Sequence, residues 1–198
     1  MNLFLTLAFL FLIGSVLGWG LEVIFRRFFS AHRWVNPGFL VGPYLPLYGS
    51  SLCVLYLLAM LESLMPVENP LLKKIMLFVV MALAITALEY VAGLIFIRGM
   101  KIKLWDYSDR WGNIQGIICP LFTFFWMVLS AVYYFLIHPH ILNALHWLAE
   151  NLAFSFGIGF FYGIFLIDVG YSTHLMVKIR EFAKETNIVV RVEELQED

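Results

Sequence analysis

The sequence predicts an all-helical, polytopic membrane protein with about five transmembrane helices. Hydrophobic residues make up 62% of its 198 residues, and charged residues make up only 14%. A soluble domain usually carries about 25% charged residues, so much of this surface must face lipid rather than water. The apolar residues also gather in five stretches of about 20 residues, the length at which a helix crosses the hydrocarbon core of a bilayer.

These five stretches define the domain organisation. The first has no preceding Lys or Arg and no small-x-small cleavage motif after it, so we expect it to remain as a helix rather than to be removed as a signal peptide. A transmembrane domain is expected over residues 1–176, followed by a cytoplasmic tail over 177–198. The expected helices lie at about 2–25, 43–65, 75–97, 117–137 and 153–176.

The basic residues predict the orientation of these helices. Eleven of the 13 Lys and Arg residues fall after the first expected helix, after the third expected helix and in the tail, whereas the segment between the second and third expected helices holds Lys73 and Lys74. Loops rich in Lys and Arg remain in the cytoplasm. The N-terminus is therefore expected outside and the C-terminus inside, and a sixth helix would place the basic tail on the wrong side.

Composition and motifs argue against several classes of function. The net charge of −1 does not suit nucleic-acid binding, which needs a basic surface. A G-x-x-x-x-G-K-[ST] motif is missing, so the chain does not hydrolyse ATP by the Walker mechanism. Two cysteines, Cys53 and Cys119, are too few for a disulfide framework. No cofactor is expected, and the spacing of His138, His140 and His146 matches no zinc pattern.

Two further patterns concern helix packing. Between the fourth and fifth expected helices, leucines recur at a spacing that predicts a short interfacial helix on the outer face. Two pairs of glycines, each four residues apart, predict close approach of helix backbones, and we expect them to join the first and last helices. The leucines are Leu142, Leu145, Leu148 and Leu152, and the glycines are Gly14, Gly18, Gly159 and Gly163.

Three carboxylates lie inside the apolar stretches, at Glu22, Glu89 and Asp168. An ionised carboxylate facing lipid is costly, so such residues turn toward protein or water and are candidates for function. Glu22 is followed at i+4 by Arg26, and a simple ion pair would also explain it. Asp168 could serve to brace another helix.

Two loops expected on the cytoplasmic side supply the remaining polar candidates. The segment 36–49 holds three prolines and three glycines, which prevent a regular helix, yet it is too apolar for an ordinary wet loop. Such a backbone either lines a cavity or packs as a hydrophobic turn at the interface. The predicted substrate-binding residues from these loops and the helices are Glu22, Asn36, Tyr48, Glu89, Asp106, Tyr107, Ser108 and Asn113.

The two loops also suggest an internal duplication. Asn36 precedes Pro43 by seven residues, and Asn113 precedes Pro120 by seven. Each proline is expected to open the next helix, and each loop follows a helix that bears a glutamate. The sequence would then form two helix-loop-helix halves, related by a pseudo-twofold axis along the membrane normal, and a ligand would bind between them. The alternative is that each asparagine merely caps the helix that follows it.

Together these motifs resemble a bacterial family of type IV ABC-transporter permeases, the CmpB-like membrane proteins. The resemblance implies transport across the bacterial cytoplasmic membrane, with contact to membrane lipid and with a separate ATPase subunit or a homo-oligomer as partner. The motifs that carry it, in family order, are Gly18-Trp19-x-x-Glu22, Asn36-x-Gly38-Phe39-Leu40-x-Gly42-Pro43-x-x-Pro46-x-Tyr48-Gly49, Leu88-Glu89-Tyr90, Trp105-Asp106-Tyr107-Ser108 and Asn113-Ile114-x-Gly116-x-x-Cys119.

Two functions therefore stay open, and the sequence favours the first. In the first, the carboxylates and loops form a substrate or ion site of a transport component, a permease or substrate-binding part, with a polar cavity at the cytoplasmic side. In the second, the chain is a membrane enzyme that acts on a lipid or lipid-linked head group. Glu22 or Glu89 would then form an acid–base pair with Asp106, while loop arginines hold phosphate. A scaffold subunit would need neither glutamate.

Overall fold

The computed structural model describes residues 2–29, 32–100, 102–186 and 190–191, and it confirms the predicted all-helical class. Five helical segments in this described part are long and apolar enough to cross a membrane. The α-helices are α1 (Leu3–Phe29), α2 (Pro46–Leu61), α3 (Pro70–Leu94), α4 (Pro120–Val132), α5 (His138–Glu150) and α6 (Ser155–Thr186). Shorter elements are the 3₁₀ turns η1 (Glu62–Leu64) and η4 (Leu152–Phe154), the π-helical segments η2 (Ile95–Met100) and η3 (Tyr133–Ile137), and the strands β1 (Ile102–Lys103) and β2 (Val190–Arg191).

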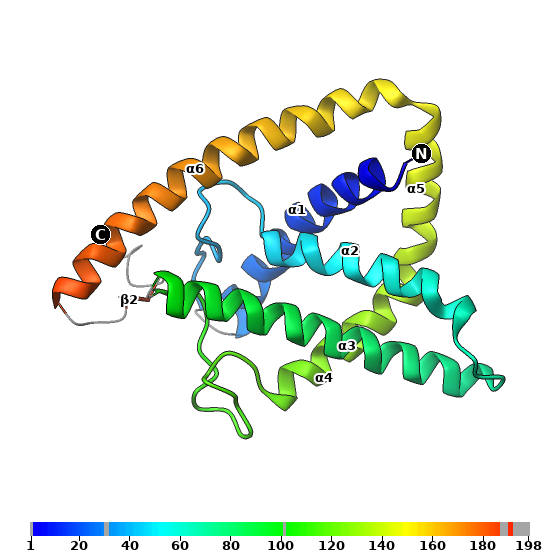
Figure 1. The fold of residues 1–198 in the computed structure, drawn as a ribbon, viewed down its shortest axis with the longest axis horizontal. Helices are drawn as coiled ribbons and strands as arrows, with labels where there is room; N and C mark the ends of the chain where they lie inside the picture. Colours follow the sequence, from blue (N-terminus) through cyan, green and yellow to red (C-terminus); the bar gives the residue numbers. More distant parts are fainter. Residues whose placement is uncertain (1, 30–31, 101, 187–189, 192–198) are drawn as a thin grey trace.

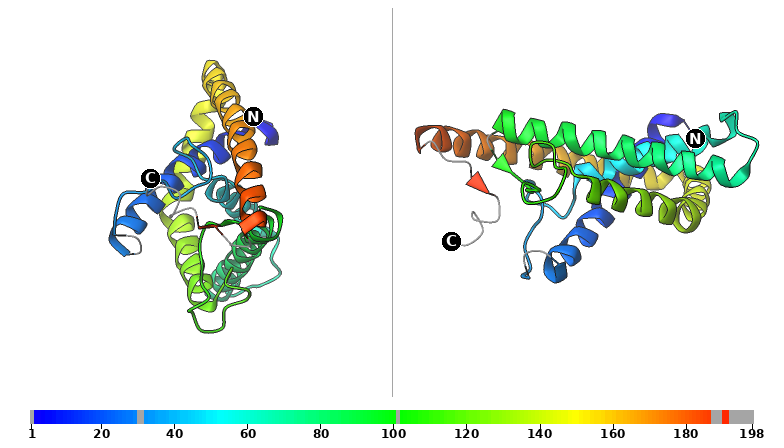
Figure 2. Two further views of the ribbon diagram at one scale, coloured as in Figure 1. Left: turned by 90° about the vertical axis from the view of Figure 1, so that its left-hand side faces the viewer. Right: turned by 90° about the horizontal axis from the view of Figure 1, so that it is seen from below.

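The helices run back and forth between two ends of the molecule (Figure 1). The segments that join α1 to α2 and α3 to α4 lie at one end, together with the C-terminal end of α6. The α2–α3 connection and α5 lie at the other end, and α6 runs along the edge of the bundle (Figures 1 and 2). Both Pro/Gly-containing loops therefore share one end, as five alternating helices require.

Prolines and an asparagine set where the helices begin. Pro46, Pro70 and Pro120 each stand at a first helical position, where the missing N–H is not needed. Asn69 caps α3 by accepting the N–H groups of Leu71 and Leu72 at 3.0 and 3.1 Å. The prediction that Pro43 opens a helix is wrong, because α2 begins three residues later.

A tertiary contact explains why α2 begins later than predicted. The Leu45 N–H donates to the Ser15 carbonyl at 2.9 Å, which fixes the loop on α1 before α2 starts. The third helix also begins earlier than expected, at Pro70 rather than 75, and α6 continues to Thr186 rather than ending near 176. Part of the expected tail is thus helix, and β2 pairs in parallel with β1. Residues 187–189 and 192–198 of the expected tail lie outside the described residues.

The core of the bundle is made by apolar side chains from four helices. Leu10, Leu55, Met81 and Leu145 are buried together, and they come from α1, α2, α3 and α5. By contrast, large apolar side chains such as Phe156 are exposed on the outside of the helices. Soluble proteins rarely expose so much apolar surface to water. In a membrane this surface faces lipid, which agrees with residence in a membrane.

One glycine pair packs as predicted in kind, but against a different helix. A Cβ atom at Gly18 would lie 2.2 Å from the Cβ of Tyr48, and one at Gly14 would lie 2.9 Å from that of Leu52, so both glycines admit α2 against α1. Gly159 and Gly163 have nothing within 4 Å of such an atom. The expected glycine contact between the first and last helices is therefore wrong.

Aromatic side chains join α1 to α6 instead. The Tyr162 hydroxyl donates to the Ala8 carbonyl at 3.0 Å, and Phe11 lies against Tyr162 and Phe165 with ring centroids 6.0 and 5.5 Å apart. Aromatic rings rather than glycines therefore make the contact between the first and last helices.

The short helix predicted between the fourth and fifth expected helices is present as α5. Its buried face is formed by Ile141, Leu145 and Leu148 rather than by the leucine series, because Leu142 is exposed. The Leu152 side chain lies outside the described set. The exposed side chains of His146 and Glu150, one helical turn apart, lie with Nε2 and Oε1 3.3 Å from each other.

Candidate functional site

The first candidate glutamate joins α1 to α2. One oxygen of Glu22 accepts the Arg26 Nε at 3.1 Å, and the other accepts the Tyr48 hydroxyl at 2.7 Å. Gly18 makes this arrangement possible, because its missing side chain lets the Tyr48 ring lie directly on α1. The ion pair weighed as an explanation of Glu22 therefore exists, and Tyr48 is added to it.

Arg26 extends the contact to the connection between α3 and α4. We call the α1–α2 connection the first loop and the α3–α4 connection the second loop. Its side chain is buried, with only 7% of the residue exposed, and its Nη2 donates to the Leu104 carbonyl at 3.0 Å. A buried guanidinium must be paired and hydrogen-bonded to be tolerated. Arg26 thus holds the end of α1 against the segment that follows β1.

The second candidate glutamate gathers α3, α4 and the second loop. Glu89 is 4% exposed, and its two oxygens accept the Tyr107 hydroxyl at 3.0 Å and the Trp126 Nε1 at 2.9 Å. Tyr107 also stacks on Phe122, with ring centroids 4.2 Å apart and planes 11° from parallel. Glu89 is therefore turned into the protein rather than toward lipid.

The two glutamates belong to neighbouring parts of one cluster. The Tyr48 and Trp126 rings, which bond to Glu22 and Glu89 respectively, lie with centroids 5.8 Å apart. Burial raises the pKa of Tyr107, and the charges of Glu89 and, more weakly, Glu22 raise this pKa further. We call the set of six side chains the carboxylate network; its members are Glu22, Arg26, Tyr48, Glu89, Tyr107 and Trp126.

Asn36 shapes the first loop. Its side-chain oxygen accepts the Trp19 indole N–H at 3.0 Å, and its amide donates to the Leu40 carbonyl at 2.8 Å. The alternative that this asparagine caps the following helix is wrong, because α2 begins after Leu45 without a side-chain cap. Asn36 thus fixes the loop beside α1.

Asp106, Ser108 and Asn113 shape the second loop. Asp106 accepts the Ser108 hydroxyl at 2.5 Å and the Lys103 ammonium at 2.9 Å. Burial alone would raise the pKa of Asp106, but hydrogen bonds from Ser108 and Lys103 outweigh it and lower that pKa to about 2. Asn113 donates to the Ser108 carbonyl at 3.0 Å and accepts the Gly116 N–H at 3.0 Å.

Gly116 is the residue around which this second loop closes. Its φ is +68°, and a Cβ atom there would lie 2.5 Å from the Ser108 Oγ. Asn113 does not cap α4, which begins after Cys119 without a side-chain cap. Asn36 and Asn113 therefore have comparable roles, each folding its own loop, although neither caps a helix.

Asp168 braces the first loop rather than another helix, as had been considered for it. Its oxygens accept the N–H groups of Val41 and Gly42 at 3.1 and 2.7 Å, the Tyr44 hydroxyl at 2.5 Å and the Ser172 hydroxyl at 2.8 Å. Burial and the hydrogen bond to this carboxylate raise the pKa of Tyr44. Asp168 thus ties α6 to the loop that precedes α2.

The structure sorts the eight predicted substrate-binding residues into two groups. It places Glu22, Tyr48, Glu89 and Tyr107 in the carboxylate network, and it uses the remaining four in shaping the loops. Sequence reasoning missed Trp126 and Trp19, although an indole N–H in an apolar stretch needs a partner and could have signalled both. In the described residues, no group of three or more His, Cys, Asp or Glu side chains could hold a metal ion.

Comparison with known proteins gives one family. The family model ABC_trans_CmpB, "Putative ABC-transporter type IV", matches residues 9–173, which include every member of the carboxylate network and both loops. A search of curated proteins and a search of solved structures returned no match.

Proposed function

We propose that this chain, a member of the ABC_trans_CmpB family of type IV ABC transporters, forms the permease or substrate-binding part of its transporter. The chain is a multi-pass membrane transport component. The carboxylate network is its solute or ion site. The binding of solute engages Glu22 and Glu89 from two sides, since they stand on α1 and α3.

The observation that carries this proposal is the placement of both glutamates within apolar spans, with Glu89 buried and Glu22 half-buried and bonded to Arg26 and Tyr48. Carboxylates in membrane segments are rare and usually mark a substrate, ion or proton pathway. Glu89 is nearly inaccessible, and its two partners, Tyr107 and Trp126, come from the second loop and from α4. A solute that competes for the Tyr107 or Trp126 donor would loosen the contact between α3, α4 and the second loop, which couples binding to movement.

The orientation supports a site that opens to the cytoplasm of a bacterial cell. Both loops share the end of the molecule that carries most of the basic residues. With those residues inside, the N-terminus lies outside, the C-terminus lies in the cytoplasm, and the network lies toward the inner surface of the membrane.

Cysteine labelling in intact cells tests this orientation. In a variant with Cys53 and Cys119 replaced by alanine, an impermeant maleimide is expected to label Glu68→Cys and Asn143→Cys, which are exposed at the outer end. Asp109→Cys, exposed in the second loop, should react only after the membrane is permeabilised. Labelling of Asp109→Cys in intact cells, with protection of the other two, would reverse the topology.

Energy for transport is proposed to come from a second protein. The chain has no Walker motif, so ATP hydrolysis requires a separate ATPase subunit. Five spans are few for a complete permease, which favours assembly with that subunit or with further copies of this chain.

Solute uptake tests the proposed function. Right-side-out and inside-out membrane vesicles are prepared from source cells with and without this protein, supplied with ATP and a cell-extract mixture, and analysed by untargeted mass spectrometry. At least one solute is expected to change its ATP-dependent distribution only when the protein is present. Identical solute profiles in vesicles with and without this protein, in both orientations and at matched total protein, would contradict transport.

The enzyme alternative ranks second because of the geometry of Asp106. An acid–base mechanism would need Asp106 to act with Glu22 or Glu89 on one substrate. Its oxygens instead accept hydrogen bonds from Lys103 and Ser108 and hold the loop in shape. A carboxylate with such a low pKa is also a poor proton donor or acceptor at neutral pH.

A further inference from the structure

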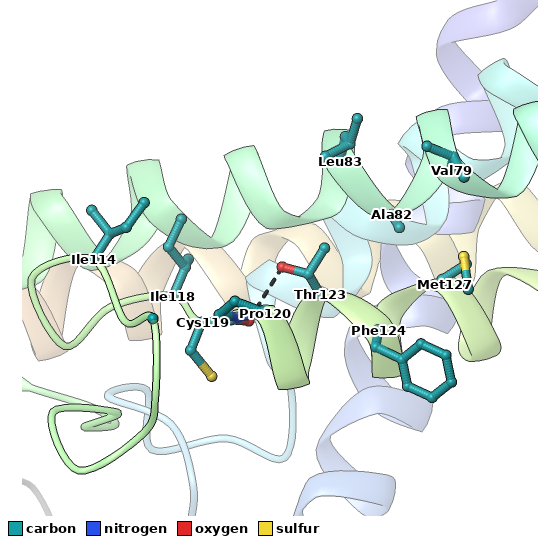
Figure 3. A pocket seen from close by; sticks show the side chains of 11 residues that line it. Val79, Ala82, Leu83, Ile114, Ile118, Cys119, Pro120, Thr123, Phe124 and Met127 are labelled. Atoms are coloured by element: carbon teal, nitrogen blue, oxygen red, sulfur yellow. Dashed lines mark hydrogen bonds between the residues drawn. The ribbon is translucent and has the colours of Figure 1, made fainter.

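A groove of about 400 Å³ lies between α3 and α4, and none of its lining residues belongs to the carboxylate network (Figure 3). Ala82 and Leu83 line it from α3, Thr123 and Phe124 from α4, and Ile114 from the second loop. A volume of this size falls within the usual range for small-molecule sites, about 300–1,000 Å³. The groove is therefore large enough for a substantial part of a ligand.

The lining of this groove accepts an apolar ligand. Thr123 carries the single hydroxyl among the lining side chains, and none of these side chains is charged. That hydroxyl is already engaged: it donates to the Cys119 carbonyl at 3.3 Å (Figure 3). It also accepts the Thr86 hydroxyl at 3.1 Å. A polar solute would find no side-chain partner here, so the groove is not a second copy of the proposed transport site.

The groove faces the hydrocarbon region of the bilayer. Leu83 and Phe124 are 58% and 53% exposed, and both belong to helical segments apolar enough to span a membrane. Between Pro120 and Met127, both of which line the groove, α4 rises by about 10 Å. Because its lining extends this far along α4, the groove suits an extended hydrocarbon chain, which the surrounding lipid supplies.

Two arginines stand near the loop end of the groove. Arg98 donates to the Gln115 side chain at 3.3 Å, next to Ile114, and Arg110 stands two residues before Gly112, which also lines the groove. Both arginines are exposed. A guanidinium group binds phosphate through paired hydrogen bonds, and anionic lipids are attracted to basic residues at the membrane surface.

We propose that this groove binds one acyl chain of an anionic phospholipid, whose phosphate is held by Arg98 and Arg110. The chain lies between α3 and α4, and the head group lies beside the second loop. A bound lipid would pack against Ile114 and Cys119, on the loop that also supplies Tyr107 to Glu89. The lipid therefore acts as a structural ligand of this loop.

Native mass spectrometry of the full chain in detergent tests the proposal. The probes are phosphatidylglycerol and phosphatidylcholine with the same acyl chains, offered at equal concentration. Wild type is expected to retain one phosphatidylglycerol per chain, with a preference of about 10- to 30-fold from two arginines. R98Q/R110Q should reduce that preference to near parity, and A82F should displace both lipids.

The matched control is A87F, because Ala87 is an exposed alanine of α3 that does not line the groove. It should bind lipid as wild type does. Equal binding of the two lipids by wild type, or equal retention by A82F and A87F, would overturn the proposal. If A82F does not yield folded protein, R98Q/R110Q decides alone, since an unchanged preference in that variant also overturns it.

Discussion

Replacing Arg26 with methionine is expected to destabilise the protein by about 3–5 kcal/mol, because removal of one partner leaves a buried charge uncompensated. Arg26 supplies the cation opposite Glu22 and also bonds to the Leu104 carbonyl. Methionine keeps most of the length of the side chain but supplies no donor. The free energy of unfolding is measured in mixed micelles by titration with a denaturing detergent.

Two variants make this result specific. Arg27→Met removes the neighbouring arginine, which lies against Phe28 and Trp34 rather than in the carboxylate network, and it should cost less than about 1 kcal/mol. The double variant Glu22→Gln with Arg26→Met should recover much of the lost stability, because no charge remains unpaired. A loss below 1 kcal/mol for Arg26→Met alone would mean that the ion pair does not support the fold.

Much of the fold can be predicted from the sequence because lipid imposes a simple rule. Every span must be about 20 apolar residues and helical, so hydropathy alone finds the five helices. Alternation then assigns both loops to one end, as the structure shows. The burial of Glu89 follows from the same rule, since a carboxylate in a span turns inward.

Choices that depend on tertiary contacts could not be predicted. Pro43 and Pro46 are both suitable first residues of a helix, and the hydrogen bond from Leu45 to Ser15 decides between them. The glycine spacing in α1 indicates close packing but does not name the partner helix. Only the position of Tyr48 over Gly18 shows that this partner is α2.

The sequence also could not show which polar residues join the carboxylate network and which shape the loops. Tyr107 and Ser108 are adjacent in sequence, yet one reaches Glu89 and the other closes a turn on Asp106. The turn depends on the positive φ of Gly116, which brings its carbonyl to the Tyr107 N–H at 2.8 Å. Local sequence supplies the chemical groups, while this loop closure decides which of them point into the bundle.

Replacing Glu89 with glutamine is expected to lower ATP-dependent solute movement at least about tenfold, which corresponds to about 1.4 kcal/mol of lost interaction. Glutamine has nearly the same shape and still accepts a hydrogen bond from Trp126 or Tyr107, so the fold should persist. It lacks the charge that a cationic solute, an ion or a proton would require. The loss should therefore appear in transport rather than in protein level.

The matched control is Glu62→Gln, at the opposite end of the bundle, where Glu62 accepts the Tyr134 hydroxyl. The same chemical change there removes a hydrogen-bonded carboxylate without touching the network. The decisive measurement is vesicle uptake of the identified solute by wild type, Glu89→Gln and Glu62→Gln at equal protein levels. We predict that Glu62→Gln transports as wild type does and Glu89→Gln does not; wild-type uptake by Glu89→Gln would contradict the assignment of the carboxylate network as the transport site.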